Sequence, residues 1–154
     1  MSTEDLLPED FADLLVELTE AGVEFVVVGG WAVVLHGLVR ATDDLDVFVR
    51  PNDANSRRVF DALTAFGAPL SAHGVTPDHF AVEGDAYRFG VAPLKVEVLS
   101  QISGVTFDEA SAESQYFEVG GCRIPYIGRS ALIRNKRAAG RHKDLADVEA
   151  LEGQ

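Results

Sequence analysis

The stretch Val28-Gly-Gly-Trp31, followed after a short interval by Asp44-Leu-Asp-Val47, decides how this chain is interpreted. The second part opens a strand-like apolar run, and successive side chains of a strand point to opposite faces. Asp44 and Asp46 therefore project from one face, while the apolar residues between and after them pack on the other. Two carboxylates about 7 Å apart repel each other unless a cation lies between them. The stretch predicts a divalent-metal site on a strand.

A second strand-like run, Leu94-Lys-Val-Glu-Val-Leu99, offers a third carboxylate. Glu97 alternates there with Val96 and Val98, so it faces away from the predicted core. Three carboxylates on adjacent strands provide the oxygen ligands that Mg²⁺ prefers. The alternative interpretation is that all three are strand-end carboxylates facing water.

The ordered set of motifs resembles the signature of the polymerase-β-type nucleotidyltransferase superfamily. That signature is a hydrophobic residue, a Gly-Gly pair, a short helix, and Asp-hydrophobic-Asp-hydrophobic, and the likeness spans roughly residues 23–151. The tail, residues 132–147, resembles the small bacterial branch that includes abortive-infection toxin (AbiEii-like) nucleotidyltransferases. The resemblance implies an α/β (α+β) fold: a small mixed sheet, helices on one face, and two C-terminal helices that close a nucleotide cleft.

The resemblance also implies an enzyme that moves a nucleoside monophosphate from an NTP, such as ATP, to an acceptor and releases pyrophosphate. Asp44 and Asp46 would hold two Mg²⁺ ions, and Glu97 would complete the site and orient or deprotonate the acceptor. Glu97 departs from the commoner form of the pattern, in which this third acid is often Asp.

Nucleotide contacts are expected from the segment before the acidic strand. Gly29 and Gly30 have no side chains, so backbone N–H groups at the start of the short helix can approach a phosphate closely. Equally, the pair can serve only as a tight turn. Thr42 can hydrogen-bond a phosphate or a metal-bound water, or form a local turn.

Basic residues in the tail are the other candidates for binding the triphosphate. Lys136 is the first choice, as a point charge on an exposed helix, and Arg141 and Lys143 are second choices. Asp144 can orient one of these bases or simply favour the first turn of its helix through the helix dipole.

Composition predicts a single domain, residues 1–154, with a core of about 23–128 and C-terminal helices of about 129–151. No apolar run approaches the roughly 20 residues that span a bilayer, so no membrane partner is expected. The N-terminus lacks the basic start and apolar stretch of a signal peptide. The one cysteine, Cys122, fits a reducing compartment, and a cytoplasmic location is expected.

Charge is distributed unevenly along the chain. The net charge of −12 argues against a general nucleic-acid binder, because phosphate contacts require Lys and Arg. Residues 122–143, however, contain seven Lys and Arg and no Asp or Glu. This segment predicts a site for a local anionic ligand, or else two solvated helix faces that balance the acidic remainder.

The acceptor is expected to be RNA, specifically a tRNA end, because the tail resembles toxin nucleotidyltransferases and is basic. A toxin–antitoxin system with a cognate toxin or antitoxin partner would follow. Protein AMPylation by an antitoxin-type enzyme is the second hypothesis, and a non-catalytic nucleotide-binding module of the same fold is the third. Aminoglycoside-type antibiotics are also acceptors in this superfamily.

Periodicity and turn signals predict the order of elements. Trp31 and His36 are expected in the core, and His73 and His79 in a loop that borders the substrate. Asp43 is expected to be solvated or to pair with Arg40 or Arg50. The expected elements are helix 5–21, strand 25–28, helix 31–38, the strand with Asp44 and Asp46, a helix opened by 51–53, loop 67–84, strands 87–91 and 95–99 around a turn at 92–93, hairpin 116–119 and 123–126, a helix capped by Ser130 and reaching 139, and helix 142–151.

Overall fold

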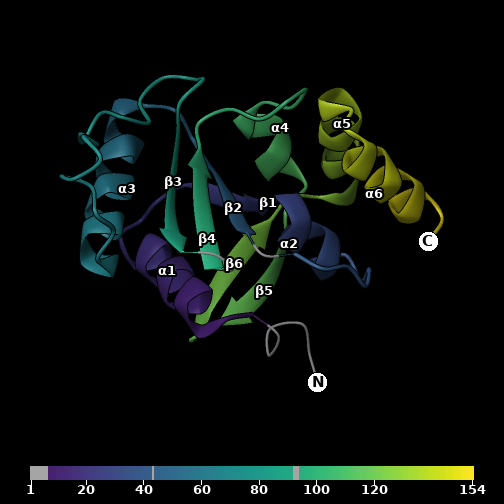
Figure 1. Cartoon of the computed structure of the whole chain (residues 1–154), viewed down its shortest axis with the longest axis horizontal. Helices are drawn as coiled ribbons and strands as arrows, with labels where there is room; N and C mark the ends of the chain where they lie inside the picture. The colour runs from purple at the N-terminus through teal and green to yellow at the C-terminus, as the bar shows by residue number, and fades with distance from the viewer. Residues whose placement is uncertain (1–6, 43, 92–93) are drawn as a thin grey trace.

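A six-stranded mixed sheet forms the centre of the protein, in a computed structural model that describes residues 7–42, 44–91 and 94–154. The strand order is β3-β4-β2-β1-β6-β5 (Figure 1). Strand β2 runs parallel to β4, and β1 runs parallel to β6, whereas the other neighbours are antiparallel. The strands are β1 (Phe25–Val28), β2 (Asp44–Val49), β3 (Ala86–Val91), β4 (Leu94–Leu99), β5 (Gln115–Val119) and β6 (Cys122–Tyr126).

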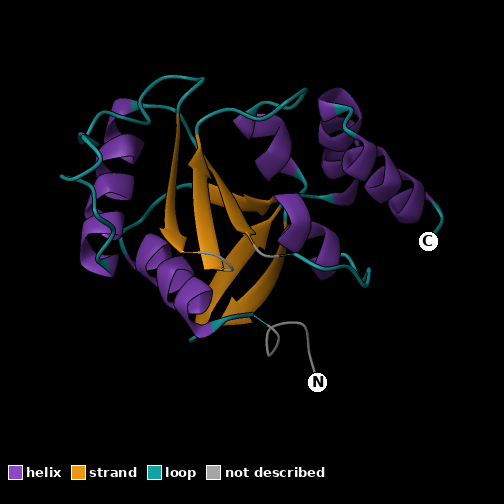
Figure 2. Cartoon of the chain, in the orientation of Figure 1, coloured by secondary structure: helices purple, strands orange, loops and turns teal. Residues whose placement is uncertain are grey.

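Helices lie on both faces of this sheet (Figure 2). Figure 1 shows α1 and α3 on one side and α4, α5 and α6 on the other. The helices are α1 (Glu9–Glu20), α2 (Gly29–Leu35), α3 (Asp53–Phe66), α4 (Phe107–Ala112), α5 (Arg129–Ala139) and α6 (His142–Glu152).

Two apolar clusters follow from the alternation along the central strands. Leu45 and Val47 of β2 pack in the cluster that contains the buried residues of α1 and α3. Phe48 points the other way and packs in the cluster formed with α4, α5 and α6. Asp44 and Asp46 have the same parity as Phe48, so they lie on the face that the C-terminal helices cover.

The α/β architecture with two C-terminal helices is confirmed, and the differences from the sequence-based expectation are local. Helix α4 was not predicted, although Thr106 and Glu109 form a capping box at its start. Helix α2 begins at Gly29 rather than at residue 31. The prediction that Ser130 caps α5 is wrong, because Gly128 occupies the N-cap position. The turn expected at 92–93 lies outside the described residues.

Within the ranges that the structure describes, no helix is both long enough and apolar enough to cross a membrane.

Candidate active site

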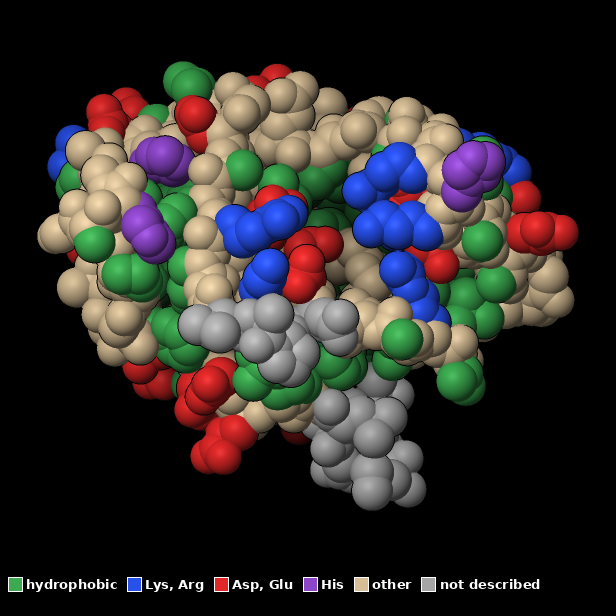
Figure 3. Space-filling view, in the orientation of Figure 1, with side chains coloured by type: hydrophobic (Ala, Val, Ile, Leu, Met, Phe, Trp, Pro, Cys, Tyr) green, Lys and Arg blue, Asp and Glu red, His purple; other side chains and the backbone are tan. Residues whose placement is uncertain are grey.

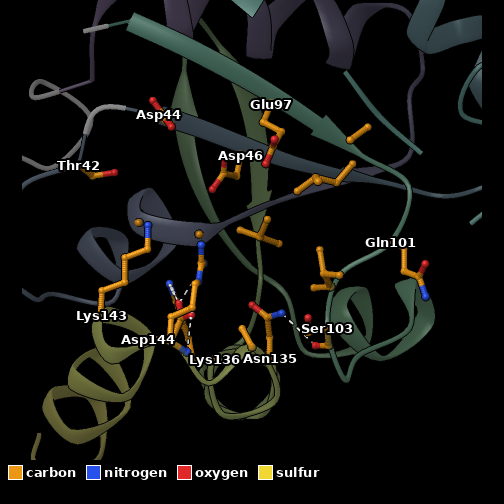
Figure 4. A pocket seen from close by; sticks show the side chains of 18 of the residues that line it. Thr42, Asp44, Asp46, Glu97, Gln101, Ser103, Asn135, Lys136, Lys143 and Asp144 are labelled. Atoms are coloured by element: carbon orange, nitrogen blue, oxygen red, sulfur yellow. Dashed lines mark hydrogen bonds and ion pairs between the residues drawn. The ribbon is translucent and has the colours of Figure 1, made fainter. Parts of the chain in front are cut away.

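A cavity of about 700 Å³ lies between the sheet and the C-terminal helices. All nine residues expected from the sequence to bind metal or nucleotide line it: Gly29, Gly30, Thr42, Asp44, Asp46, Glu97, Lys136, Arg141 and Lys143. Figure 4 shows Asp44, Asp46 and Glu97 on the strand side, with Lys136, Lys143 and Asp144 on the helix side. Figure 3 shows acidic side chains at the bottom of a hollow, with Lys and Arg side chains on both sides.

Strand register brings the carboxylates together. In the parallel pair of β2 and β4, Asp46 lies opposite Glu97. Asp46 also lies opposite Val28 on β1, the residue directly before the Gly-Gly pair. The strand order therefore gathers three sequence segments that are far apart in the chain.

Asp46 occupies an unfavourable place for a negative charge. Burial, together with the negative charges of Glu97 and Asp44, raises the pKa of its carboxyl from 3.8 to about 6. The positive charges of Lys136 and Arg88 act in the opposite direction. An ionised Asp46 thus needs more positive charge than its neighbours supply.

The three carboxylates fit a divalent cation by chemistry and by register. A cation would provide the positive charge that Asp46 lacks, through the oxygen ligands that Mg²⁺ prefers. In the part of the chain that the structure describes, however, no three His, Cys, Asp or Glu side chains are already gathered as a metal-binding group. Glu97 instead accepts two hydrogen bonds from Arg88, at 3.2 and 3.0 Å.

The Gly-Gly pair is required by close packing. Gly29 has a φ of +67°, and a Cβ there would lie 2.2 Å from Asp46 Oδ2. A Cβ at Gly30 would lie 2.3 Å from Thr42 Oγ1. The structure therefore shows the tight turn, which places the start of α2 directly against a candidate metal ligand.

Lys136 lies inside the protein. The prediction that it stands on an exposed helix face is wrong, because only 5% of the residue is exposed. Its Nζ lies 3.2 Å from Asp144 Oδ1 and 3.1 Å from Asp147 Oδ2. Lys136 is therefore held by two carboxylates of α6 and contributes its charge to the cavity wall from below the surface.

The ion pairs around Lys136 extend to the neighbouring elements. Arg141 Nε donates to Asp144 Oδ2 at 2.7 Å, and Arg40 Nη1 donates to Asp147 Oδ2 at 2.5 Å. Burial alone raises the pKa of Asp144, but the hydrogen bond from Arg141 and the charge of Lys136 hold that pKa below its usual value. This network ties α5 and α6 to the segment before β2.

Both arginines that the sequence offered as partners of Asp43 pair with other carboxylates among the described residues. Arg40 pairs with Asp147, and Arg50 pairs with Glu24 and with Asp108, the latter at 2.7 Å. Asp43, the expected partner of one of them, lies outside the described residues.

Lys143 differs from the other basic residues of the tail. It extends from α6 into the cavity (Figure 4). No hydrogen bond or ion pair joins it to another residue within 7–42, 44–91 or 94–154. Its ammonium group is therefore available to an anionic ligand.

The acid-free segment 122–143 does not form an open basic surface. Within the described residues, six of its seven basic side chains contact other groups of the protein. Arg123 stacks on Tyr116, Arg129 donates to the Leu151 carbonyl, Arg134 pairs with Glu109, Arg137 pairs with Glu152, and Lys136 and Arg141 pair as described above. The segment therefore has less charge to offer a polyanion than its sequence indicates.

Other side chains around the cavity were missed by sequence reasoning. Asn135 Nδ2 donates to the Ser103 carbonyl at 3.0 Å and so links α5 to the loop after β4. Figure 4 shows Gln101, Ser103 and Asn135 together at one end of the cavity, away from Lys143. His73 and His79 do not line this cavity, and His73 Nδ1 lies 2.7 Å from the Tyr87 hydroxyl instead.

Comparison with known families decides to which family the chain belongs. Residues 10–151 match the family model described as aminoglycoside-2''-adenylyltransferase. The chain belongs to this family. No curated protein matches the sequence.

Solved structures of nucleotidyltransferases share the fold. The lincosamide antibiotic adenylyltransferase LnuA, bound to lincomycin, superposes with a TM-score of 0.60 at 15% identity, over 95% of this chain and 96% of that one. An antigenic nucleotidyltransferase-like protein from Paracoccidioides brasiliensis gives 0.56 at 16% identity, over 97% and 74%. A putative nucleotidyltransferase from Thermotoga maritima gives 0.54 at 15% identity, over 91% and 86%.

Membership of the aminoglycoside-2''-adenylyltransferase family makes this chain a nucleotidyltransferase of the polymerase-β-like superfamily. Such an enzyme uses an NTP as substrate. The comparisons support the superfamily but not the abortive-infection branch inferred from the tail.

Proposed function

We propose that this protein transfers AMP from ATP, with Mg²⁺, to a hydroxyl group of a small, positively charged, hydroxyl-rich acceptor of the aminoglycoside type. The observation that carries the proposal is one cavity that combines three carboxylates on adjacent strands with a cation of α6 that pairs with no described residue. The family match supplies the adenylyl group and the class of acceptor.

Asp44, Asp46 and Glu97 are the residues that would hold Mg²⁺. When bound there, Mg²⁺ would align the triphosphate with the acceptor oxygen and neutralise the charge that develops on both. Glu97 would also accept the proton of the acceptor hydroxyl; its position in the cavity lining, opposite Asp46, supports this role.

The triphosphate is assigned to the α6 side of the cavity. Lys143 supplies a cation that no described residue neutralises, and Arg141 adds a guanidinium whose side chain is mostly exposed. Thr42 and the backbone of Gly29 and Gly30 also line the cavity. Lys136 would contribute its positive charge to the cavity without touching the triphosphate, because Asp144 and Asp147 enclose its Nζ.

A small cationic acceptor agrees best with the size of the cavity and with the net charge of the protein. The cavity of about 700 Å³ falls within the usual range for small-molecule sites. The net charge of −12 attracts cations and repels polyanions. A tRNA end has less support because most basic residues of the tail pair internally, and neither a protein acceptor nor a toxin–antitoxin partner has an observation in its favour.

Labelled ATP tests the proposal directly. The protein is incubated with ATP labelled at the α-phosphate, Mg²⁺, and separately an aminoglycoside panel, total tRNA or a cell lysate. We expect label on an aminoglycoside, with release of pyrophosphate. Label that nuclease removes would assign a tRNA acceptor, label that protease removes would assign a protein, and no pyrophosphate in any arm would indicate a non-catalytic nucleotide-binding module.

A further inference from the structure

Three charged residues form a row across three strands of the sheet. Asp46 on β2 lies opposite Glu97 on β4, and Glu97 lies opposite Arg88 on β3. Residues in register on neighbouring strands point to the same face, so the three side chains are neighbours. Glu97 is therefore flanked by a carboxylate on one side and a guanidinium on the other.

Arg88 holds Glu97 by a single oxygen. Its Nε and Nη2 donate to Glu97 Oε2 at 3.2 and 3.0 Å. Among the described residues, no hydrogen bond to the second oxygen, Oε1, is found. Both donors thus fix the carboxylate while one of its oxygens stays available in the cavity.

We infer that Arg88 is a positioning residue for Glu97. It restrains the carboxylate through Oε2, so that Oε1 is presented to the acceptor hydroxyl or to a bound cation. This inference rests on the proposed Mg²⁺-dependent transfer, in which Glu97 is the third carboxylate.

The chemistry of Glu97 explains why a positioning residue is needed. Glu has one more rotatable bond than the Asp that is commoner at this place in the superfamily signature, so its carboxylate reaches more positions. Two contacts from a planar guanidinium, both made to Oε2, restrict that freedom better than a single-point cation does. The backbone that carries Arg88 is anchored, because the neighbouring side chains of Tyr87 and Phe89 are buried on the other face of β3.

Stability alone does not account for this pair. The Arg88 side chain is 57% exposed, and exposed ion pairs contribute little to the free energy of unfolding. Replacing Arg88 should therefore leave the fold intact, and its effects on metal binding and on turnover can be measured separately.

Removal of Arg88 has two consequences of opposite sign. The positive charge beside Glu97 competes with a divalent cation for the same carboxylate, so its loss should strengthen Mg²⁺ binding. At the same time Glu97 loses its restraint, so the fraction of molecules with a correctly placed carboxylate falls. A purely structural role of Arg88 does not predict tighter Mg²⁺ binding together with slower turnover.

The test compares Arg88→Ala and Arg88→Lys with the wild-type protein. Arg123→Ala is the control, since it removes the same charge from β6, where the guanidinium stacks on Tyr116 outside the cavity. Mg²⁺ affinity is measured by calorimetry without nucleotide. The kcat and the KM for ATP are measured with the acceptor that the labelling experiment identifies. Thermal unfolding of each variant verifies the fold.

We expect Arg88→Ala to bind Mg²⁺ several-fold more tightly, to lose roughly tenfold to a hundredfold in kcat, and to keep its KM for ATP. Arg88→Lys should restore the Mg²⁺ affinity and part of kcat, and Arg123→Ala should resemble the wild type. In a Glu97→Gln background, Arg88→Ala should change Mg²⁺ affinity much less than it does in the wild type, because only the smaller charge effect of Arg88 on Asp46 remains.

Unchanged kcat, or Mg²⁺ affinity that is equal or weaker in folded Arg88→Ala, would overturn the inference while leaving the proposed function in place. If the wild type transfers AMP to no acceptor, the proposed function fails instead. The Mg²⁺ affinities of the Arg88 variants then decide alone whether Arg88 acts on Glu97.

Discussion

Lys136 Nζ lies 3.2 Å from Asp144 Oδ1 in a part of the protein where both residues are almost fully buried. Buried charges are costly unless they are paired, and breaking one such pair leaves the other charge without compensation. Asp144 keeps Arg141 as a second partner, which limits that penalty.

Lys136→Met is therefore expected to destabilise the protein by about 2–4 kcal/mol. The matched control is Arg134→Ala on the same helix, whose exposed pair with Glu109 should contribute less than about 1 kcal/mol. Urea unfolding of both variants measures the difference. Equal stability of Lys136→Met and the wild type would show that the buried network does not hold α5 to α6.

The raised pKa of Asp46 predicts that, in the absence of metal, the free energy of unfolding depends on pH. Its pKa is about 6 in the folded protein against 3.8 for an ordinary Asp, so the folded state binds the proton more tightly. The free energy of unfolding should then fall as pH rises from about 4 to about 6, by at most about 3 kcal/mol. Burial is the largest cause of this shift; the charges of Glu97 and Asp44 add to it, and those of Lys136 and Arg88 oppose it.

Asp46→Asn removes that titration, so the metal-free variant should be more stable than the wild type at pH 7–8. Chemical unfolding at several pH values, with and without Mg²⁺, provides the measurement. Mg²⁺ should stabilise the wild type and have little effect on the variant. A wild-type stability that rises between pH 4 and 6 in parallel with Asp46→Asn would contradict the assigned environment of Asp46.

Alanine substitutions at Gly29 and Gly74 separate the effect of close packing from the effect of backbone conformation. Gly29→Ala should cost at least about 2–3 kcal/mol, because the new Cβ would lie 2.2 Å from Asp46 Oδ2. Gly74 has nearly the same φ, +69° against +67°, but nothing lies within 4 Å of its added Cβ. Gly74→Ala should therefore cost only about 1 kcal/mol, and similar losses at both positions in thermal unfolding would refute the packing argument.

Lys143→Ala tests the assignment of the triphosphate to α6. A charge-assisted phosphate contact contributes about 1.5–3 kcal/mol, so the KM for ATP should rise at least about tenfold with a smaller change in kcat. Arg137→Ala, whose partner is Glu152, removes a charge from the neighbouring helix and should leave that KM unchanged. Unchanged ATP affinity of Lys143→Ala would place the triphosphate elsewhere.

The sequence anticipated which residues line the cavity better than it anticipated how those residues are packed. Local signals were sufficient for β2 and β4, since alternation sends Asp46 and Glu97 to one face regardless of the rest of the fold. Burial of Lys136 was not predictable, because it depends on how α6 packs against α5 and on two carboxylates eight and eleven positions further along the chain.

Arg88 was missed for a related reason. Its importance comes from the antiparallel register of β3 and β4, which pairs it with Glu97. Strand alternation placed it on one face of β3, opposite buried Tyr87 and Phe89, but only the register identifies its partner. Helix α4 was missed although a capping box marks its start, because it contains only six residues and shows little periodicity.

AMP transfer by the wild type and by the double variant Asp44→Asn, Asp46→Asn is the most direct test of a carboxylate-held, metal-dependent transferase. Both folded proteins are given ATP labelled at the α-phosphate, Mg²⁺ and the aminoglycoside panel. The wild type should release pyrophosphate and label an aminoglycoside, and the double variant should do neither. Label transfer by the double variant at the wild-type rate would contradict the account.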